Sequence, residues 1–399
     1  MMNSNEIYRD AVLRHQIGVR RYQSGLVKEV SKVLATADKA LAADLRLKLS
    51  AIEATGQPID YQGRRWKALL ESIRQQRGAL LDQVKEEVTG QLNLFGTMEA
   101  KREGSLLATS LPIEYNFAVV AQHLVAAVVV AKPFNGYLLS GWFDNLKNAE
   151  QRRLIATLQT GMINGETTDD IVRKVIGTRK NNYTDGVVAM TRRDATAVIR
   201  TATNHVSNAA RDLVWQENSD VITTKVWAST LDGRTSAGCR ARDGRAVPLG
   251  NNKLPPELKP LHPAGITPPA HVNCRSTMVA YIDGVGLIGQ RPYVTDTRTR
   301  NNREVDFRRL AKEQGTTVAE VRREWAEKNI GRVPNATTYN DFLRRQSAEF
   351  QDEVLGKTKG KLFREGGLEL QNFVDRDGNE LTLKQLEKTR PEAFRKITP

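Results

Sequence analysis

The feature that most constrains the fold is a series of apolar side chains recurring every three or four positions in the first quarter of the chain. Between Arg65 and Phe95 this series is interrupted once, by Arg77. Such spacing places apolar side chains along one face of an amphipathic α-helix. The members of the series are Trp66, Leu69, Leu70, Ile73, Leu80, Leu81, Val84 and Val88. The chain must therefore bury a long apolar stripe against other helices, in the same chain or in a neighbouring subunit.

Three further helices are predicted from similar patterns. One runs from about Ile7 to Ala54, with a kink allowed near Gly25, and another covers Thr191–Asn218. The most apolar run, Phe117–Ala131, is interrupted by Gln122 and His123. It falls short of the ~20 residues that span a bilayer. We therefore expect a buried helix there, with His123 in the core, and no membrane partner.

The pattern changes to that of β-strands after residue 220. Residues 221–230 and 276–282 are rich in β-branched and aromatic side chains, which favours two strands. Residues 229–278 hold both cysteines of the chain, two of its five histidines and seven of its fourteen prolines. We call residues 229–278 the clasp, and we expect a long, ordered, proline-rich loop that joins the two strands.

Charge and cysteine content limit the classes of partner and compartment. Sixty Lys and Arg side chains face forty-six Asp and Glu, a formal net charge of +14. Such an excess raises the local concentration of polyanions, so nucleic acid or an acidic protein surface is an expected neighbour. Two cysteines in 399 residues are too few for a disulfide framework. The first 21 residues contain no apolar signal segment, and we expect synthesis in the cytoplasm.

The cysteines and histidines of the clasp leave several kinds of chemistry open. Two thiolates and two imidazoles suit a tetrahedral zinc ion, and the candidate ligands are Cys239, His262, His271 and Cys274. A disulfide between the two cysteines is the second alternative. A catalytic Cys–His pair oriented by Asp232, Asp243 or Asn273 is the third. The fourth, which we favour with or without a metal, is a loop anchor with no catalytic role.

The clasp carries an ordered set of motifs. An Asp-x-Arg-Thr-Ser-x-x-Cys-Arg-x-x-Asp-Gly run follows a strand containing a tryptophan, and a Pro-Pro-x-His-x-Asn-Cys-Arg-Ser run closes the loop. This order resembles the phage head morphogenesis family, the Mu F-like minor head proteins, over roughly residues 156–282. The residues that we expect to be structural are Trp227, Asp232, Arg234, Asp243, Gly244, Pro269, Asn273 and Arg275. Ser236 stands where some members of the family have a first cysteine.

The resemblance implies a virion protein without enzymatic activity. Its expected location is the head interior or the portal vertex, after assembly in the host cytoplasm. Its expected partners are the portal protein, other head or scaffolding proteins, and double-stranded DNA bound without sequence preference. Zinc is the only cofactor that the ligand set indicates. The alternatives are a metal-dependent nuclease that uses His271, and a free non-specific DNA-binding protein.

The predicted fold class is α+β and predominantly helical, in four regions. Residues 1–150 form long helices, and 151–285 form a central α+β domain with the proline-rich loop between its strands. Residues 286–335 form a basic linker and a helix, which a capping box of Thr317 and Glu320 begins. Residues 336–399 form a small helical or α+β module, in which one helix runs from Thr338 to Gly356.

Overall fold

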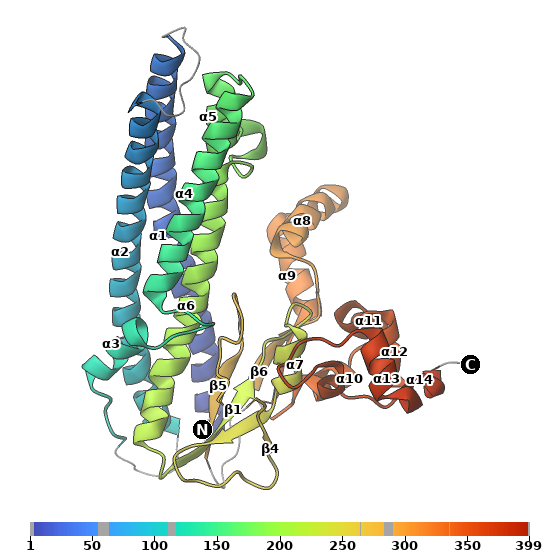
Figure 1. Cartoon of the computed structure of the whole chain (residues 1–399). Helices are drawn as coiled ribbons and strands as arrows, with labels where there is room; N and C mark the ends of the chain where they lie inside the picture. Colours follow the sequence, from blue (N-terminus) through green and yellow to red (C-terminus); the bar gives the residue numbers. More distant parts are fainter. Residues whose placement is uncertain are drawn as a thin grey trace.

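The computed structural model describes residues 4–54, 64–110, 117–263, 265–282, 290–334 and 336–397. Four long helices lie side by side and form an elongated bundle (Figure 1). They are α1 (Ser4–Glu53), α2 (Arg64–Ser110), α4 (Leu139–Ile163) and α6 (Val187–Glu217). The short helix α5 (Thr168–Ile176) packs against α1, and the 3-10 turn η1 (Arg179–Asn181) follows it. The fold is α+β and predominantly helical, as predicted.

The bundle forms because the apolar stripes meet along its axis within one chain. Val84 and Val88 of α2 pack with Leu26 of α1 in one core, to which α4 and α6 also contribute. A second core further along the bundle contains Trp66 and Leu158. The helix α2 continues beyond the predicted end at residue 95, and α1 passes residue 25 without a break. The helix α4 also runs through residue 150, where the sequence placed a boundary.

Arg77, which interrupts the apolar stripe of α2, is one of the most deeply buried side chains. It is 1% exposed and lies between two carboxylates of neighbouring helices. Its Nη1 donates to Asp38 Oδ1 at 3.0 Å, and its Nη2 donates to Glu150 Oε1 at 2.5 Å. The attraction within this cluster opposes the cost of removing the charges from water, although burial still raises the pKa of Asp38.

The apolar run at 117–131 gives a shorter and more exposed helix than predicted. Only α3 (Gln122–Ala131) is helical, and it buries Val125, Val128 and Val129 against the bundle. His123 is exposed, so its predicted place in the core is wrong. The helix has one buried face, and His123 lies on the other. Among the described residues, no helix combines the length and apolar character needed to cross a membrane.

A four-stranded sheet lies at the end of the bundle and has the order β4-β3-β1-β5. Its strands are β1 (Ile222–Ala228), β3 (Arg245–Pro248), β4 (Lys259–Pro260) and β5 (Thr277–Ile282). The two strands predicted from the sequence, β1 and β5, are antiparallel neighbours, with Trp227 opposite Met278. This pairing brings the beginning and the end of the clasp together.

A second sheet of three strands carries a pair of helices. Its order is β2-β6-β7, and the strands are β2 (Leu231–Asp232), β6 (Gln290–Val294) and β7 (Ile330–Pro334). Between β6 and β7 the chain forms α8 (Arg300–Gln314) and α9 (Val318–Asn329). The predicted capping box is present at the start of α9.

The C-terminal part forms a compact group of short helices beside the second sheet (Figure 1). They are α10 (Tyr339–Arg344), α11 (Ala348–Leu355), α12 (Lys357–Arg364), η2 (Leu370–Phe373), α13 (Leu383–Thr389) and α14 (Pro391–Ile397). Phe342, Phe363 and Leu386 are buried in its core. The predicted single helix from Thr338 is instead two helices, because Ser347 acts as a new N-cap and accepts a hydrogen bond from the Phe350 amide.

Candidate functional site

The first half of the site is the short helix α7 (Ala237–Arg242). Ser236 begins this helix, and its hydroxyl accepts a hydrogen bond from the Cys239 amide at 3.4 Å. Cys239 is 2% exposed and packs in an apolar core with Trp215 and Trp227. The helix therefore directs its one thiol inward, toward the returning end of the clasp.

The second half is a tight turn at His271–Cys274. The Cys274 amide donates to the His271 carbonyl at 3.0 Å, which closes the turn. Asn273 has φ +59°, a left-handed conformation that asparagine tolerates better than most residues. Its amide donates to Thr201 Oγ1 of α6 at 2.9 Å, which fixes the turn on the bundle. The turn directs the His271 imidazole and the Cys274 thiol toward Cys239.

These two halves bring three potential ligands to one point. Cys239 Sγ lies 3.4 Å from His271 Nε2 and 3.8 Å from Cys274 Sγ. All three ligand atoms lie within 4.8 Å of one another, and the two thiols are free. Both cysteines are buried, whereas His271 is exposed. Residues separated by more than thirty positions therefore form a single group at the surface of the core.

Two of the three distances within this group are those expected around a tetrahedral metal ion. Ligand atoms bound at about 2.0–2.3 Å to one zinc lie roughly 3.3–3.8 Å from each other. The two distances from Cys239, at 3.4 and 3.8 Å, fall within this interval. His271 Nδ1 lies 3.0 Å from the Val272 carbonyl. A metal-bound histidine usually donates its second ring N–H to such an acceptor, which leaves Nε2 for the metal.

The fourth predicted ligand, His262, does not join the other three. Its side chain is exposed, and the group of ligand atoms within 4.8 Å contains only Cys239, His271 and Cys274 among the described residues. Its backbone carbonyl accepts a hydrogen bond from Arg242 Nε at 3.3 Å. The hydroxyl oxygen of Ser236 lies beside the group, 3.0 Å from His271 Nε2. A hydroxyl thus stands where some members of the family have a cysteine.

The two thiols differ in acidity because they interact directly. The hydrogen bond between them raises the pKa of Cys239, and burial acts in the same direction. The same hydrogen bond lowers the pKa of Cys274 against the effect of burial, and His271 contributes to the lowering. The pKa of His271 is raised, chiefly by its hydrogen bond with Cys274, while burial opposes this. Cys274 is therefore the thiol that favours the thiolate form.

The two aspartates of the motif hold the clasp in place. Asp232 accepts two hydrogen bonds from the Arg275 guanidinium, at 2.5 and 2.7 Å. Burial acts to raise the pKa of Asp232, but the hydrogen bonds and charge of Arg275 outweigh it, and the pKa is lowered. Arg234 contributes a backbone amide that donates to Asp232 Oδ1 at 3.1 Å. The first motif of the clasp is thus bonded directly to the last.

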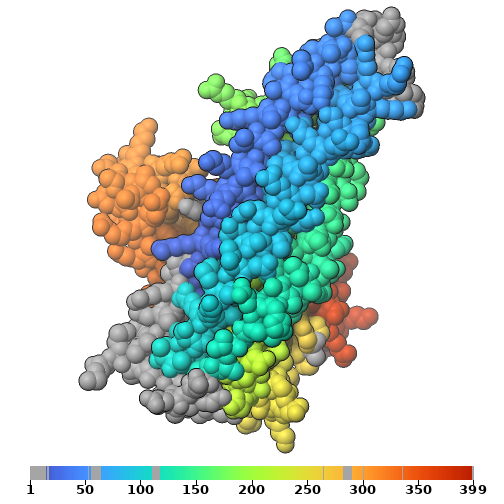
Figure 2. All heavy atoms as spheres, turned by 90° about the vertical axis from the view of Figure 1, so that its left-hand side faces the viewer, coloured from blue at the N-terminus to red at the C-terminus, as the bar shows by residue number. Residues whose placement is uncertain are grey.

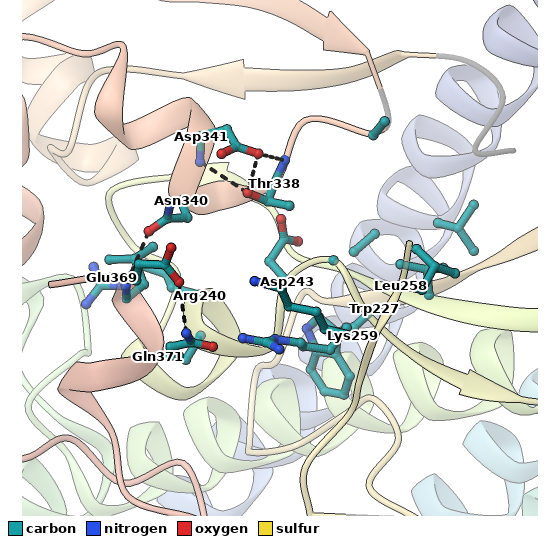
Figure 3. Close-up of a pocket in the computed structure, with 18 of the residues that line it drawn as sticks. Trp227, Arg240, Asp243, Leu258, Lys259, Thr338, Asn340, Asp341, Glu369 and Gln371 are labelled. Carbon is teal, nitrogen blue, oxygen red and sulfur yellow. Dashed lines mark hydrogen bonds between the residues drawn. The ribbon is translucent and has the colours of Figure 1, made fainter. Parts of the chain in front are cut away.

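Asp243 connects the clasp to the C-terminal helices. Its carboxylate accepts from Arg291 Nη1 at 2.8 Å, from the Ser229 amide at 2.5 Å and from the Tyr339 amide at 2.5 Å. Gly244 has φ +77°, and a Cβ atom there would lie 2.7 Å from Thr338 Cγ2. Figure 3 shows the Asp243 side chain pointing toward the start of α10. The Asp-Gly pair is therefore required for the close approach of two parts of the chain.

The remaining motif residues are also used in packing and hydrogen bonding. Trp227 is 1% exposed, and its Nε1 donates to Ser229 Oγ at 3.0 Å. Pro269 is buried. On α6, Asn204 donates to the Cys274 carbonyl at 2.9 Å, and Asn208 Oδ1 accepts from the Met278 amide at 3.0 Å. The long helix α6 thus binds the end of the clasp and the start of β5.

The residues considered for catalysis are not arranged around His271. Asp232 and Asp243 are bonded to arginines, and no described hydrogen bond joins either of them, or Asn273, to the imidazole. A cavity of about 520 Å³ lies between the four-stranded sheet and the C-terminal helices (Figure 3). Trp227, Arg240 and Asp243 line it, whereas neither thiol nor His271 does. The cavity and the Cys–His group are separate.

Sequence reasoning missed three residues that complete the site. Ser229 Oγ donates to the Cys239 carbonyl at 2.7 Å and lies 3.3 Å from Ser276 Oγ, so it links the two ends of the clasp. Arg291 and Tyr339 supply the partners of Asp243 from outside the clasp. Serine and arginine are common at surfaces, and no spacing in the sequence distinguishes these buried examples.

Comparison with known proteins supports the resemblance drawn from the motifs. Residues 153–279, 127 of the 399 in the chain, match the family described as "Phage Mu protein F like protein". This match confirms the predicted relationship to the Mu F-like head morphogenesis family, and it contains the whole clasp. The family associates the chain with phage head morphogenesis and with the virion. No curated protein and no solved structure matches the chain.

Proposed function

We propose that this chain is a minor head protein that acts at the portal vertex, in head assembly and in the packaging or ejection of DNA. The observation that carries the proposal is the use of the motif residues within the family-matched segment. The motif's charged and polar residues bond one part of the protein to another, as Asp232 does with Arg275 and Asp243 with Arg291. An architectural role in an assembly uses such residues in this way.

The proposal includes the absence of catalysis by the clasp. A Cys–His nucleophile pair requires a group that orients the histidine and a cavity for the substrate. The two candidate aspartates are occupied by arginines, and the thiols do not line the 520 Å³ cavity. These observations favour a structural element over an active site.

Double-stranded DNA is one proposed partner, beside the portal protein and other head or scaffolding proteins. The chain has a net charge of +14. Lys and Arg side chains that contact phosphates release counterions, so such binding is independent of sequence and weakens steeply with salt. A protein located where the genome enters and leaves the head would meet DNA at high local concentration.

A structural zinc ion is the second part of the proposal. Cys239, His271 and Cys274 would hold it, and the donor set and spacing support this assignment. When bound, zinc would supply a cross-link between α7 and the turn at residues 271–274, with Ser236 or water completing the tetrahedron. Elemental analysis of protein purified without chelator should give about one zinc per chain. A metal-free protein of equal stability would contradict it.

Composition of purified particles tests the main proposal. We expect the chain in mature heads and in procapsids, at few copies relative to the portal protein, as measured by quantitative mass spectrometry. Absence from particles, with the chain free in the lysate, would instead indicate a free DNA-binding protein. Cleavage of plasmid DNA that needs a divalent metal and is abolished by His271→Ala would indicate a nuclease.

A further inference from the structure

We propose that the helix pair α8–α9 is a helix-turn-helix element that binds duplex DNA, with α9 lying in the major groove. The inference rests on the proposed contact with DNA, and it assigns that contact to a defined surface. The helix α8 ends at Gln314 and is followed by Gly315, which has φ +66°, and α9 begins at Val318. Two helices joined by a turn of three or four residues that contains glycine are typical of this motif.

The pair has a small hydrophobic core of its own. Phe307, Ala311 and Val321 are buried, and Trp325 packs against them with its ring centroid 5.7 Å from that of Phe307. Trp325 Nε1 also donates to Asp296 Oδ2 at 2.6 Å, which attaches α9 to the segment that leads into α8. The core holds the two helices in one fixed arrangement. Their outer residues therefore form a preorganised surface.

This surface is rich in basic side chains that lack an ion-pair partner. Between residues 298 and 332 there are ten Lys or Arg and six Asp or Glu, a net charge of +4. Some of these arginines are neutralised locally; Arg322, for example, pairs with Glu304 at 2.7 Å. Four exposed basic residues of α8 and α9 form no ion pair with any described residue: Arg308, Lys312, Arg323 and Lys328. These four charges are available to phosphates.

The helix α9 has one buried and one exposed face, and the exposed face carries Glu324 and Glu327 beside its basic residues. Val321 and Trp325 face the core, whereas Ala319 and Arg323, four positions apart, are exposed together. A small alanine beside an arginine lets the helix approach a groove closely while the longer side chain reaches its edge. In a helix-turn-helix protein the N-terminal part of the second helix makes this approach.

The position of the pair in the molecule leaves this surface accessible. In Figure 2 the segment around residues 300–330, in orange, forms a lobe that projects from the side of the long bundle. Arg308 and Lys312 are one helical turn apart on α8, and Arg323 lies on α9, so basic residues occur on both sides of the turn. Phosphates on the two sides of a groove would meet basic side chains from both helices.

Binding of the full-length protein to a 30-bp duplex, measured by fluorescence anisotropy between 50 and 200 mM salt, tests the inference. The test variant carries Arg308→Gln, Lys312→Gln and Arg323→Gln. Each lost phosphate contact should lower the slope of log K against log salt by about 0.9. The fall in affinity over this salt range should therefore be about 40-fold smaller than for the wild type.

A matched variant separates the surface from net charge. Lys39→Gln, Lys67→Gln and Lys101→Gln remove the same charge from exposed positions on α1 and α2. We expect these changes to leave the salt slope nearly unchanged. An equal loss of slope in both triple variants would overturn the inference, because general charge would then explain DNA binding.

A steric variant tests the assignment of α9 to the groove. Ala319→Glu adds a carboxylate to the exposed face and should weaken duplex binding at least tenfold, whereas Ala68→Glu at an exposed position of α2 should not. Circular dichroism verifies the helical content of each variant. Unchanged DNA binding by Ala319→Glu, together with reduced incorporation into heads, would show that the surface binds protein and overturn the inference.

The outcome is separable from that of the main proposal. If the wild type has no affinity for duplex DNA at 50 mM salt, both the inference and the proposed contact with DNA fail, while membership of the head is unaffected. The chain could instead be absent from particles while the variants of α8 and α9 lose DNA binding. In that case the portal proposal fails and the inference stands.

Discussion

The helical bundle and the clasp achieve a defined structure by different means. The bundle buries long apolar stripes, and it also tolerates internal clusters of ionisable side chains, such as that of Arg77, Asp38 and Glu150. The clasp has few apolar side chains for its length and is held by Asp232, Asp243 and their arginine partners, beside a group of potential metal ligands. Distributed hydrophobic burial is therefore sufficient for long helices, whereas an irregular loop depends on a few strong polar contacts.

The largest effect is expected from removing the charge at the centre of the bundle. Arg77→Ala leaves the buried Glu150 carboxylate without its ion-pair partner and leaves Asp38 with the longer ion pair to Arg192, at 3.6 Å. It should lower the free energy of unfolding by about 3–5 kcal/mol. Urea denaturation followed by far-ultraviolet circular dichroism measures this. The control Arg74→Ala, on the exposed face of the same helix, should change it by at most about 1 kcal/mol. A small effect of Arg77→Ala would show that apolar packing alone holds the bundle.

Removing the Asp243 carboxylate should lower stability nearly as much, but the effect should be confined to the clasp and the C-terminal helices. Asp243→Ala removes the only carboxylate that pairs with the buried Arg291 among the described residues and leaves two backbone amides without their acceptor, a loss of about 3 kcal/mol. Limited proteolysis should then release the C-terminal helices while the bundle resists. Asp169→Ala, at an exposed ion pair of the bundle, is the control. Equal protection in both variants would contradict the role given to Asp243.

Metal should stabilise the clasp and leave the bundle unaffected. Zinc at one hundred times its Kd should add about 2.7 kcal/mol to the unfolding free energy of the clasp. The increase should be absent in Cys274→Ser and larger in Ser236→Cys, which supplies a fourth strong ligand. Hydrogen exchange at the amides of residues 237–242 and 271–276 reports on the clasp separately from the bundle. Equal protection with and without zinc would contradict zinc binding by the clasp.

Acid should affect the two regions over different pH ranges. His205 of α6 is buried and stacks on Phe134 at 4.9 Å; burial lowers its pKa to about 4 from an ordinary 6.5. The unfolded chain therefore binds this proton first, and the bundle should lose about 2 kcal/mol of stability between pH 7 and pH 5. The pKa of Asp232 is instead lowered, so its contribution persists above the ordinary carboxyl range and is lost only at still lower pH.

The variant His205→Gln isolates the bundle's part of this response. Its stability should vary less between pH 7 and pH 5 than that of the wild type, and the difference between the two proteins gives the contribution of His205. Identical pH profiles for the two proteins would show that the imidazole is not held neutral in the folded state.

Several features of the fold could be predicted because they depend on local spacing. The periodicity of α2 and α6, the strands β1 and β5 and the capping box at Thr317 each follow from neighbouring residues. The exposure of His123 could not, because an apolar run does not reveal which face of a helix meets the protein. The break between α10 and α11 depends on a cap at Ser347 that competes with continuation of the helix.

The sequence by itself determined the helical character of the chain, the place and order of the clasp motifs and the family of the central segment. Those properties reside in spacing and residue type. Only the tertiary structure decided that Cys239, His271 and Cys274 meet while His262 does not, and that Arg77 lies between two carboxylates. The reason is physical: distances between side chains far apart in the chain depend on how strands pair and helices pack, and no local pattern records them.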